Sequence, residues 1–143
     1  MVPWFTSKGK EIQATQASYA YGKLPAQDTE RARRFYEEKL GLRPFGERNR
    51  HLYYEVGKVR FVVFPSNGLP SGTHDQLGLV VDDLDSAMAE LRSKGIVFED
   101  YPGLTEDSIA TFGPMKAAWF KDSEGNLLSL AEQPTMLMIS PDG

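Results

Sequence analysis

The sequence predicts a single α+β domain made of two tandem βαβββ modules, each a strand, a helix and three further strands. Two amphipathic helices of one design predict this repeat, together with a strand-like run before each helix and three such runs after it. The second helix signal begins at Asp83 and repeats the pattern that begins at Asp28. A chain of 143 residues suffices for one ordinary core but not for two, so the modules are expected to share one domain.

The first helix is expected between Asp28 and Gly41. Asp28 can cap the first turn, Glu30 adds negative charge there, and Gly41 suits the end of the helix. Apolar residues recur between them at helical spacing, at Ala32, Phe35, Tyr36 and Leu40. Residues 20–26 predict the strand before this helix, and residues 42–47, 51–56 and 59–64 predict three strands after it, the last two joined by a hairpin-type turn.

The second module repeats this pattern from Asp83 to Gly95. The apolar stripe of its helix is Leu84, Ala87, Met88 and Leu91, with Arg92 and Lys94 in the last turn. Residues 77–81 predict the strand before the helix, and residues 96–99, 116–120 and 127–131 the three strands after it. The turn from Asp122 to Asn126 joins the last two strands, and the loop of residues 100–113 either covers a pocket mouth or is surface decoration.

Composition also predicts the boundaries between segments. Residues 1–17 are interpreted as an N-terminal extension, 18–65 as the first module, 66–73 as a linker rich in Pro, Gly and Ser, 74–133 as the second module, and 134–143 as a C-terminal tail in which 136–139 could form a short edge strand. The core is therefore expected to come from the two modules alone.

The charge balance and the lack of cysteine exclude several classes of protein. A formal net charge of -4 disfavours binding to nucleic acid or anionic membranes. The chain has no cysteine, which excludes disulfides, thiolate nucleophiles and cysteine-based metal sites. No run approaches the roughly 20 apolar residues of a membrane helix, and residues 1–17 lack the apolar run of a secretory signal. We therefore expect a soluble, cytoplasmic protein.

Three stretches resemble motifs of the vicinal oxygen chelate family, which includes glyoxalases, bleomycin-resistance proteins and extradiol dioxygenases. They are residues 24–28 with Arg34-Phe35-Tyr36 and Leu40-Gly41-Leu42, residues 80–84, and residues 120–128 around the turn from Asp122 to Asn126. In that family each module is a curved βαβββ unit, and paired modules form a cupped mixed sheet around a central cavity for a small molecule. The resemblance implies the same fold and cavity here.

The resemblance also implies where a metal would bind. Enzymes of the family usually hold a divalent metal with a His or Gln near the start of each first strand and a Glu on each last strand. Carried over by position, these sites fall at Tyr21, Gln76, Ser129 and a fourth position near Phe61 or Val62. Only Gln76 is a plausible ligand, because phenols, hydroxyls and apolar groups bind divalent ions far worse than imidazoles and carboxylates. We therefore expect no metal at the usual site and no cofactor.

The two histidines and one glutamate leave an alternative open. His74 lies two residues before Gln76 and would share its strand face, while His51 and Glu55 lie on one predicted strand near the cup. A lone histidine is more often a surface or structural residue, and a glutamate there could be a solvated strand-edge charge. A rearranged metal site of His51, Glu55 and Gln76 remains the alternative to these plainer interpretations.

Strand alternation predicts which side chains line the cavity. The expected ligand-binding residues are Tyr21, Lys23, Tyr53, Glu55, Phe61, Val63, Gln76, Trp119 and Ser129, with Met115, Ala117, Leu127 and Ala131 completing the wall. Such an aromatic surface suits flat or hydrophobic ligands, although the same side chains could simply fill a core between the sheets. An inward Lys23 favours the pocket, because a buried lysine needs solvent or an anion.

Three functions are compatible with these features. The first is a metal-free protein that sequesters a small hydrophobic or aromatic molecule, as bleomycin-resistance members of the family sequester a drug. The second is a lyase, isomerase or dioxygenase with a non-standard metal site, or with acid-base chemistry at Glu55, Lys23 or Tyr21. The third is a partner module whose strand edges mediate dimerisation, and a homodimer is expected in any case. A fold alone does not decide among them.

Overall fold

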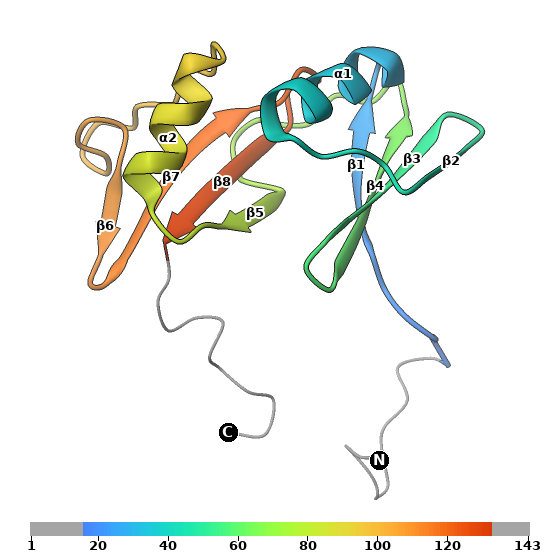
Figure 1. Cartoon of the computed structure of the whole chain (residues 1–143), viewed down its shortest axis with the longest axis horizontal. Coiled ribbons are helices and arrows are strands. Elements are labelled where there is room, and N and C mark those ends of the chain that lie inside the picture. Colours follow the sequence, from blue (N-terminus) through green and yellow to red (C-terminus); the bar gives the residue numbers. More distant parts are fainter. Residues whose placement is uncertain (1–15, 133–143) are drawn as a thin grey trace, which may run out of the picture.

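The computed structural model describes residues 16–132 as two four-stranded sheets, each accompanied by one helix (Figure 1). The first module contains β1 (Gly22–Ala26), α1 (Thr29–Leu40), β2 (Gly46–Arg48), β3 (His51–Val56) and β4 (Val59–Pro65) in the sheet order β1-β4-β3-β2. The second contains β5 (Leu77–Val80), α2 (Leu84–Ser93), β6 (Ala110–Phe112), β7 (Met115–Lys121) and β8 (Leu127–Glu132) in the order β5-β8-β7-β6. The identical element and strand orders confirm an α+β fold of two similar modules.

Both sheets are mixed in the same way. β1 runs parallel to β4 and β5 runs parallel to β8, whereas all other strand pairs are antiparallel. The helix after each first strand carries the chain back along the sheet, so the next strand runs in the same direction as the first. Two antiparallel connections then bring the last strand of the module parallel to the first. In the register, Leu24 lies opposite Val63 and Leu79 lies opposite Leu130. All four side chains belong to the face that packs on a helix.

The N-caps predicted for both helices and the C-cap predicted for α1 are confirmed, whereas α2 ends at Ser93 with Lys94, not Gly95, as its C-cap. The Asp28 carboxylate accepts a hydrogen bond from the Arg31 N–H at 3.0 Å, and the Asp83 carboxylate accepts one from the Ser86 N–H at 3.1 Å. Gly41 ends α1 at a φ of 69°, a left-handed conformation that glycine adopts without strain. The local cap signals are therefore sufficient to place both helices.

The hydrophobic core lies between each helix and one face of its sheet. Tyr36 of α1 is fully buried, with its ring centroid 5.3 Å from that of Tyr54 and 6.1 Å from that of Phe61. Met88 of α2 and Phe120 of β7 belong to the same cluster of buried side chains. The two modules thus share one hydrophobic core. The opposite face of each sheet is covered by neither α1 nor α2.

The strand predicted over residues 96–99 is wrong. Ile96 and Phe98 are buried in the core, but the segment is not part of a strand ladder. It makes a backbone hydrogen bond from the Glu99 N–H to the Trp119 carbonyl at 2.8 Å. The fourth strand of the second sheet is instead β6, which lies inside the predicted loop. Buried apolar side chains can therefore anchor an extended segment without strand pairing.

The strand predicted over residues 42–47 is displaced, because β2 begins only at Gly46. The Leu42 N–H donates to the Tyr36 carbonyl at 2.9 Å and thus completes the end of α1. Pro44 has no N–H to offer a sheet. The predicted edge strand 136–139 lies outside the described residues, as do residues 1–15 of the predicted extension and the whole of the predicted tail.

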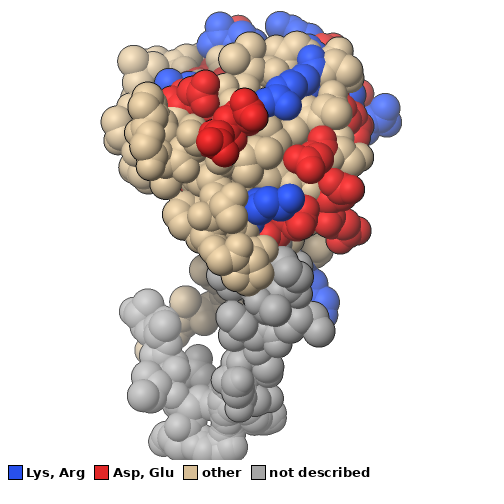
Figure 2. All heavy atoms as spheres, turned by 90° about the vertical axis from the view of Figure 1, so that its left-hand side faces the viewer, with Lys and Arg blue, Asp and Glu red and all other residues tan. Residues whose placement is uncertain are grey.

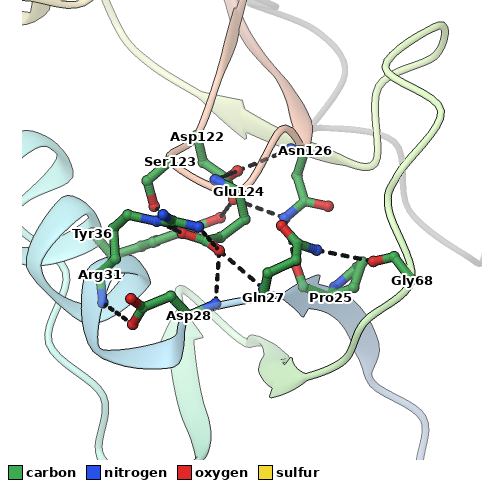
Figure 3. Close-up of polar contacts among 10 residues, drawn as sticks. All are labelled: Pro25, Gln27, Asp28, Arg31, Tyr36, Gly68, Asp122, Ser123, Glu124 and Asn126. Carbon is green, nitrogen blue, oxygen red and sulfur yellow. Dashed lines mark hydrogen bonds and ion pairs between the residues drawn. The ribbon is translucent and has the colours of Figure 1, made fainter.

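A buried glutamate in the turn between β7 and β8 joins the two modules (Figure 3). The Glu124 side chain is fully buried and accepts backbone hydrogen bonds from Gln27 and Asp28, both at 3.0 Å. Arg31 of α1 donates to both carboxylate oxygens, at 2.7 and 2.9 Å. Burial opposes ionisation, but hydrogen bonds from Arg31, Ser123 and the Asp28 N–H outweigh it and lower the pKa of Glu124 to about 2.

Asp122 and Asn126 extend this contact on the same turn (Figure 3). The Tyr36 hydroxyl donates to Asp122 at 2.7 Å, and the Asn126 amide donates to Asp122 at 2.9 Å and to the Pro25 carbonyl at 3.0 Å. Burial raises the pKa of Asp122, which these hydrogen bonds partly offset. The turn from Asp122 to Asn126, which resembles a motif of the family, therefore stabilises the contact between the second module and the first.

The surface of the second module is mixed in charge. On the face around α2 and β6, acidic and basic side chains are interspersed, and its described residues form no broad basic area (Figure 2). Neither α1 nor α2, the helices of the described region, is long and apolar enough to cross a membrane.

Candidate functional site

The first sheet carries a hollow of about 450 Å³. Tyr54 and Phe61 point toward α1, so their strand neighbours Tyr53 and Arg60 point to the opposite face, and both line the hollow. The segments before β1 and around β2 complete the lining, which includes Tyr19, Tyr21, Phe45, Gly46 and Arg48. All of the lining residues belong to the first module.

Exposed aromatic side chains border this hollow. Tyr19 is 75% exposed, Tyr21 49% and Phe45 56%, whereas other aromatic residues of the chain, such as Tyr36 and Tyr54, are buried in the core. The rings of Tyr19 and Tyr21 lie 6.3 Å apart, as do those of Phe45 and Tyr53. Large aromatic side chains that gather around one hollow and remain exposed are typical of a binding surface.

Two cations accompany these aromatic rings. The Arg60 guanidinium lies 4.8 Å from the centre of the Phe45 ring, and its Nε lies 3.4 Å from the Glu55 carboxylate. The Lys23 ammonium lies 4.7 Å from the centre of the Phe64 ring. Lys23 is exposed, so its ammonium group does not pay the cost of burial that was expected for an inward-pointing lysine. The first-sheet face is thus aromatic and locally cationic.

The second sheet presents a wall of small and aromatic side chains on its helix-free face. The register sets Gly78 of β5, Ser129 of β8 and Trp119 of β7 side by side. A Cβ atom on Gly78 would lie 3.2 Å from the Ser129 hydroxyl, so glycine makes room for it. Trp119 packs edge-on against Tyr101, with the ring centroids 5.7 Å apart.

Gln76 adds a hydrogen-bond acceptor beside this wall. Its backbone N–H donates to the Leu127 carbonyl at 2.8 Å and so extends the pairing of β5 with β8. Its side-chain Oε1 is buried and has no hydrogen-bond partner among the described residues. A buried acceptor of this kind is costly unless a donor from a ligand or water reaches it.

The residues at the usual metal positions of the family do not fit a divalent ion. Tyr21 immediately precedes β1 and Gln76 immediately precedes β5, which confirms that the two positions are equivalent. Ser129 pairs with Gly78, and the equivalent residue of the first module is Val62, which pairs with Lys23. The four side chains are a phenol, an amide, a hydroxyl and an isopropyl group. No carboxylate or imidazole is among them.

The rearranged metal site is disfavoured as well. His51 and Glu55 lie four residues apart on β3, which is about 13 Å along a strand. The His51 Nδ1 hydrogen bonds with the Asn49 carbonyl and Glu55 pairs with Arg60, while His74 contacts Ser71 in the linker. Residues 16–132 contain no group of three or more His, Asp or Glu side chains that could hold a metal ion.

The predicted orientation of Phe61 and Val63 toward the cup is wrong. Phe61 stacks on Tyr54 with the ring centroids 5.1 Å apart, and Val63 is fully buried in the core under α1. Residues that lie opposite each other on neighbouring strands project to the same face of a sheet. Phe61 lies opposite Gly22 and Val63 lies opposite Leu24, so both side chains of β4 project to the face that packs on α1. Phe61 is only 2% exposed, so very little of its surface is available to the hollow that it borders.

The other predicted ligand-binding residues form two groups. Tyr21 and Tyr53 line the hollow, with Lys23 and Glu55 on the same sheet face. A second group lies on the second sheet and consists of Gln76, Trp119 and Ser129. Their role in ligand binding stays a prediction.

The sequence did not predict Tyr19, Phe45 or Arg60 as parts of the site. Tyr19 precedes the first predicted strand, and Phe45 falls in a segment that was assigned to a strand. Arg60 could have been found from the alternation of the hairpin, because it lies opposite Glu55 across β3 and β4. The three residues are far apart in the chain, and the fold brings them to one hollow.

The chain belongs to the Glyoxalase/Bleomycin resistance protein/Dioxygenase superfamily, whose family model matches residues 16–130. No relative among the curated proteins matches the sequence. Solved structures of this fold are similar to it over most of its length.

One similar structure is TnmS3, an antibiotic binding protein from Streptomyces sp. CB03234, with 23% identity and a TM-score of 0.63 over 81% of this chain and 98% of that one. A glyoxalase/bleomycin resistance protein from the same organism is 25% identical, with a TM-score of 0.59 over 78% of this chain and 96% of that one. The fosfomycin resistance protein FosX from Listeria monocytogenes shares 10% identity, with a TM-score of 0.65 over 82% and 93% of the two chains. These likenesses establish the fold.

Proposed function

We propose that this protein binds and sequesters a small hydrophobic or aromatic molecule without a metal ion. The observation that carries the proposal is the hollow of about 450 Å³, bordered by three exposed aromatic rings. Exposing these rings is unfavourable unless they contact something, and ring stacking is the contact that they form best. A cavity of this size falls within the range of about 300–1,000 Å³ that is usual for small-molecule sites.

Binding without a metal follows from the donors at the family's usual positions. Catalysis through a divalent ion needs several hard or borderline ligands that face one point. Tyr21, Val62, Gln76 and Ser129 supply no negative charge at neutral pH. The protein therefore binds its ligand without converting it. A cytoplasmic location is consistent with a chain that has no cysteine.

A homodimer would complete the enclosure of the ligand. The hollow is lined by the first module alone, and the wall of Gly78, Trp119 and Ser129 lies on another sheet. Pairing of the hollow with this wall from a second copy would cover the exposed aromatic rings of the hollow and the partly exposed Trp119. Light scattering would test the assembly, and a monomer at micromolar concentration would contradict it.

Two of the similar structures also support a binding function. TnmS3 is described as an antibiotic binding protein, and the 25%-identical structure as a glyoxalase/bleomycin resistance protein. An antibiotic or another aromatic natural product is accordingly the kind of ligand that we propose to test.

Direct binding measurements test the proposal. Naphthalene derivatives are titrated into the purified protein by calorimetry, with and without a chelator, and metal content is measured in parallel. We expect saturable binding that the chelator leaves unchanged and that Tyr21→Ala weakens about tenfold or more, because one stacking wall is lost. Replacement by Ala of Leu69, which is exposed and is not part of the lining, is the control. Stoichiometric bound metal that is needed for binding would overturn the metal-free proposal.

A further inference from the structure

We infer that the ligand is a planar aromatic molecule with an anionic group, a carboxylate or sulfonate, and that Arg60 is the partner of that group. The inference rests on the proposed function, since it assigns a chemical class to the ligand of the same hollow. Four features of the described residues support it: the position of Arg60, its loose pairing with Glu55, the balance of charge around the hollow, and the rings on either side.

Arg60 lies between the aromatic side chains of the hollow. Its guanidinium carbon lies over the Phe45 ring, 4.8 Å from the ring centre, and the side chain projects from the same sheet face as Tyr53. Contact with a ring leaves the N–H groups at the edge of a guanidinium free to donate hydrogen bonds. An arginine held in this way can bind a carboxylate or sulfonate in a bidentate manner next to an aromatic ring.

The present partner of Arg60 holds it weakly. The Arg60 Nε lies 3.4 Å from the Glu55 carboxylate, longer than the roughly 2.7–2.9 Å of a good charge-assisted hydrogen bond. Both side chains are about half exposed, and exposed pairs of this kind contribute little. A ligand anion in the hollow can therefore compete with Glu55 for the guanidinium.

The charge around the hollow is positive although the whole chain carries -4. Arg48 and Arg60 line the hollow; Arg60 pairs loosely with Glu55, and Arg48 has no ion-pair partner among the described residues. The acidic residue of the lining, Glu47, pairs with Arg33 of α1. Local positive charge on an acidic protein favours an anionic ligand and disfavours a cationic one.

The aromatic residues specify the rest of the ligand. Tyr19 and Tyr21 lie on the segment before β1, and Tyr53 and Phe45 lie on and near the β2–β3 hairpin, so flat rings can enter between the two sets. A planar ring that stacks there would place a substituent within reach of Arg60. One ligand class, the planar aromatic acid, satisfies the rings and the cation together.

Three probes with one ring system and different charge test this assignment. They are 2-naphthoate, 2-naphthalenemethanol and 2-naphthylmethylammonium, titrated into the full chain by calorimetry at low and at moderate salt. We expect the anion to bind about tenfold more tightly than the alcohol, and the cation to bind most weakly, with the preference shrinking as salt rises. Inorganic sulfate should compete only weakly, because it lacks the ring.

Variants assign the preference to Arg60. Arg60→Gln should reduce the preference for the anion over the alcohol from about tenfold to about twofold or less, and Arg60→Lys should restore part of this preference. Glu55→Gln should tighten 2-naphthoate binding, because it removes the competing carboxylate. The matched control is Arg43→Gln, which also removes one exposed arginine from an ion pair but lies outside the lining.

The outcomes separate the two proposals. If the three probes bind with equal affinity, or if Arg60→Gln keeps the preference for the anion, the assignment of an anionic ligand is overturned while the binding function stands. If none of the probes binds to a protein that remains folded by circular dichroism, the hollow is not a binding site and the proposed function fails with it.

Discussion

Replacement of Glu124 by Gln should destabilise the fold through the contact between its modules. The change removes the charge from a fully buried side chain that accepts two backbone N–H groups and two bonds from Arg31. Loss of one partner of a buried ion pair costs about 3–5 kcal/mol. Arg31 is half exposed and water can solvate it after the change, so we expect a loss of about 2 kcal/mol.

Urea denaturation measures this loss. With a slope of about 1–3 kcal/mol per molar urea, the midpoint should fall by roughly 1 M. The matched control is Glu30→Gln on the first turn of α1, which removes an exposed carboxylate 3.4 Å from Arg33. It should change the free energy of unfolding by less than about 1 kcal/mol.

The pH dependence of the same variant tests the electrostatic origin of the loss. The pKa of Glu124 falls from its ordinary 4.5 to about 2 in the folded protein, so the unfolded state binds the proton more tightly. The carboxylate therefore stabilises the fold fully above pH 4.5, and this contribution disappears as the pH falls from 4.5 toward 2. The difference between wild type and variant should shrink over that window. A difference that stays constant from pH 7 to pH 2.5 would refute the reasoning.

Three further changes have expected outcomes. Tyr36→Phe removes the buried hydrogen bond to Asp122 and should lower the free energy of unfolding by about 1–3 kcal/mol in urea titrations; an unchanged midpoint would show that the bond contributes nothing. Gly41→Ala places a side chain at a φ of 69° and should cost about 1 kcal/mol, seen as a lower melting temperature, whereas a rise would contradict the left-handed cap. Gly78→Ala brings a Cβ to 3.2 Å from the Ser129 hydroxyl and should cost about 1 kcal/mol, which Ser129→Ala in the same chain should restore; additive losses in the double variant would exclude the clash.

The helices were predictable because their signals are local. Asp28 and Asp83 each accept a hydrogen bond from the N–H three residues later, so a cap and an apolar stripe within one short window define each helix. The strands after the second helix were less predictable. The segment with Ile96 and Phe98 has the composition of a strand, but pairing depends on which other chain segments reach the sheet.

The orientation of β4 is signalled weakly by its own residues. Phe61, Val62, Val63 and Phe64 are all apolar, so only the charge of Arg60 distinguishes the two faces of the strand. Its pairing with β1 decides the matter, because Leu24 faces α1 and lies opposite Val63. An alternating pattern carries information only where one face is polar.

The sequence by itself determined the repeat, the family and the lack of carboxylate and imidazole groups at the family's usual metal positions. Caps, spacing and side-chain chemistry are properties of single residues or short windows. The tertiary structure alone decided that Tyr21, Tyr53, Phe45 and Arg60 surround one hollow, and that Glu124 fastens the turn of one module to the helix of the other. Those contacts join residues far apart in the chain, and their geometry depends on strand register and module packing, which no local pattern encodes.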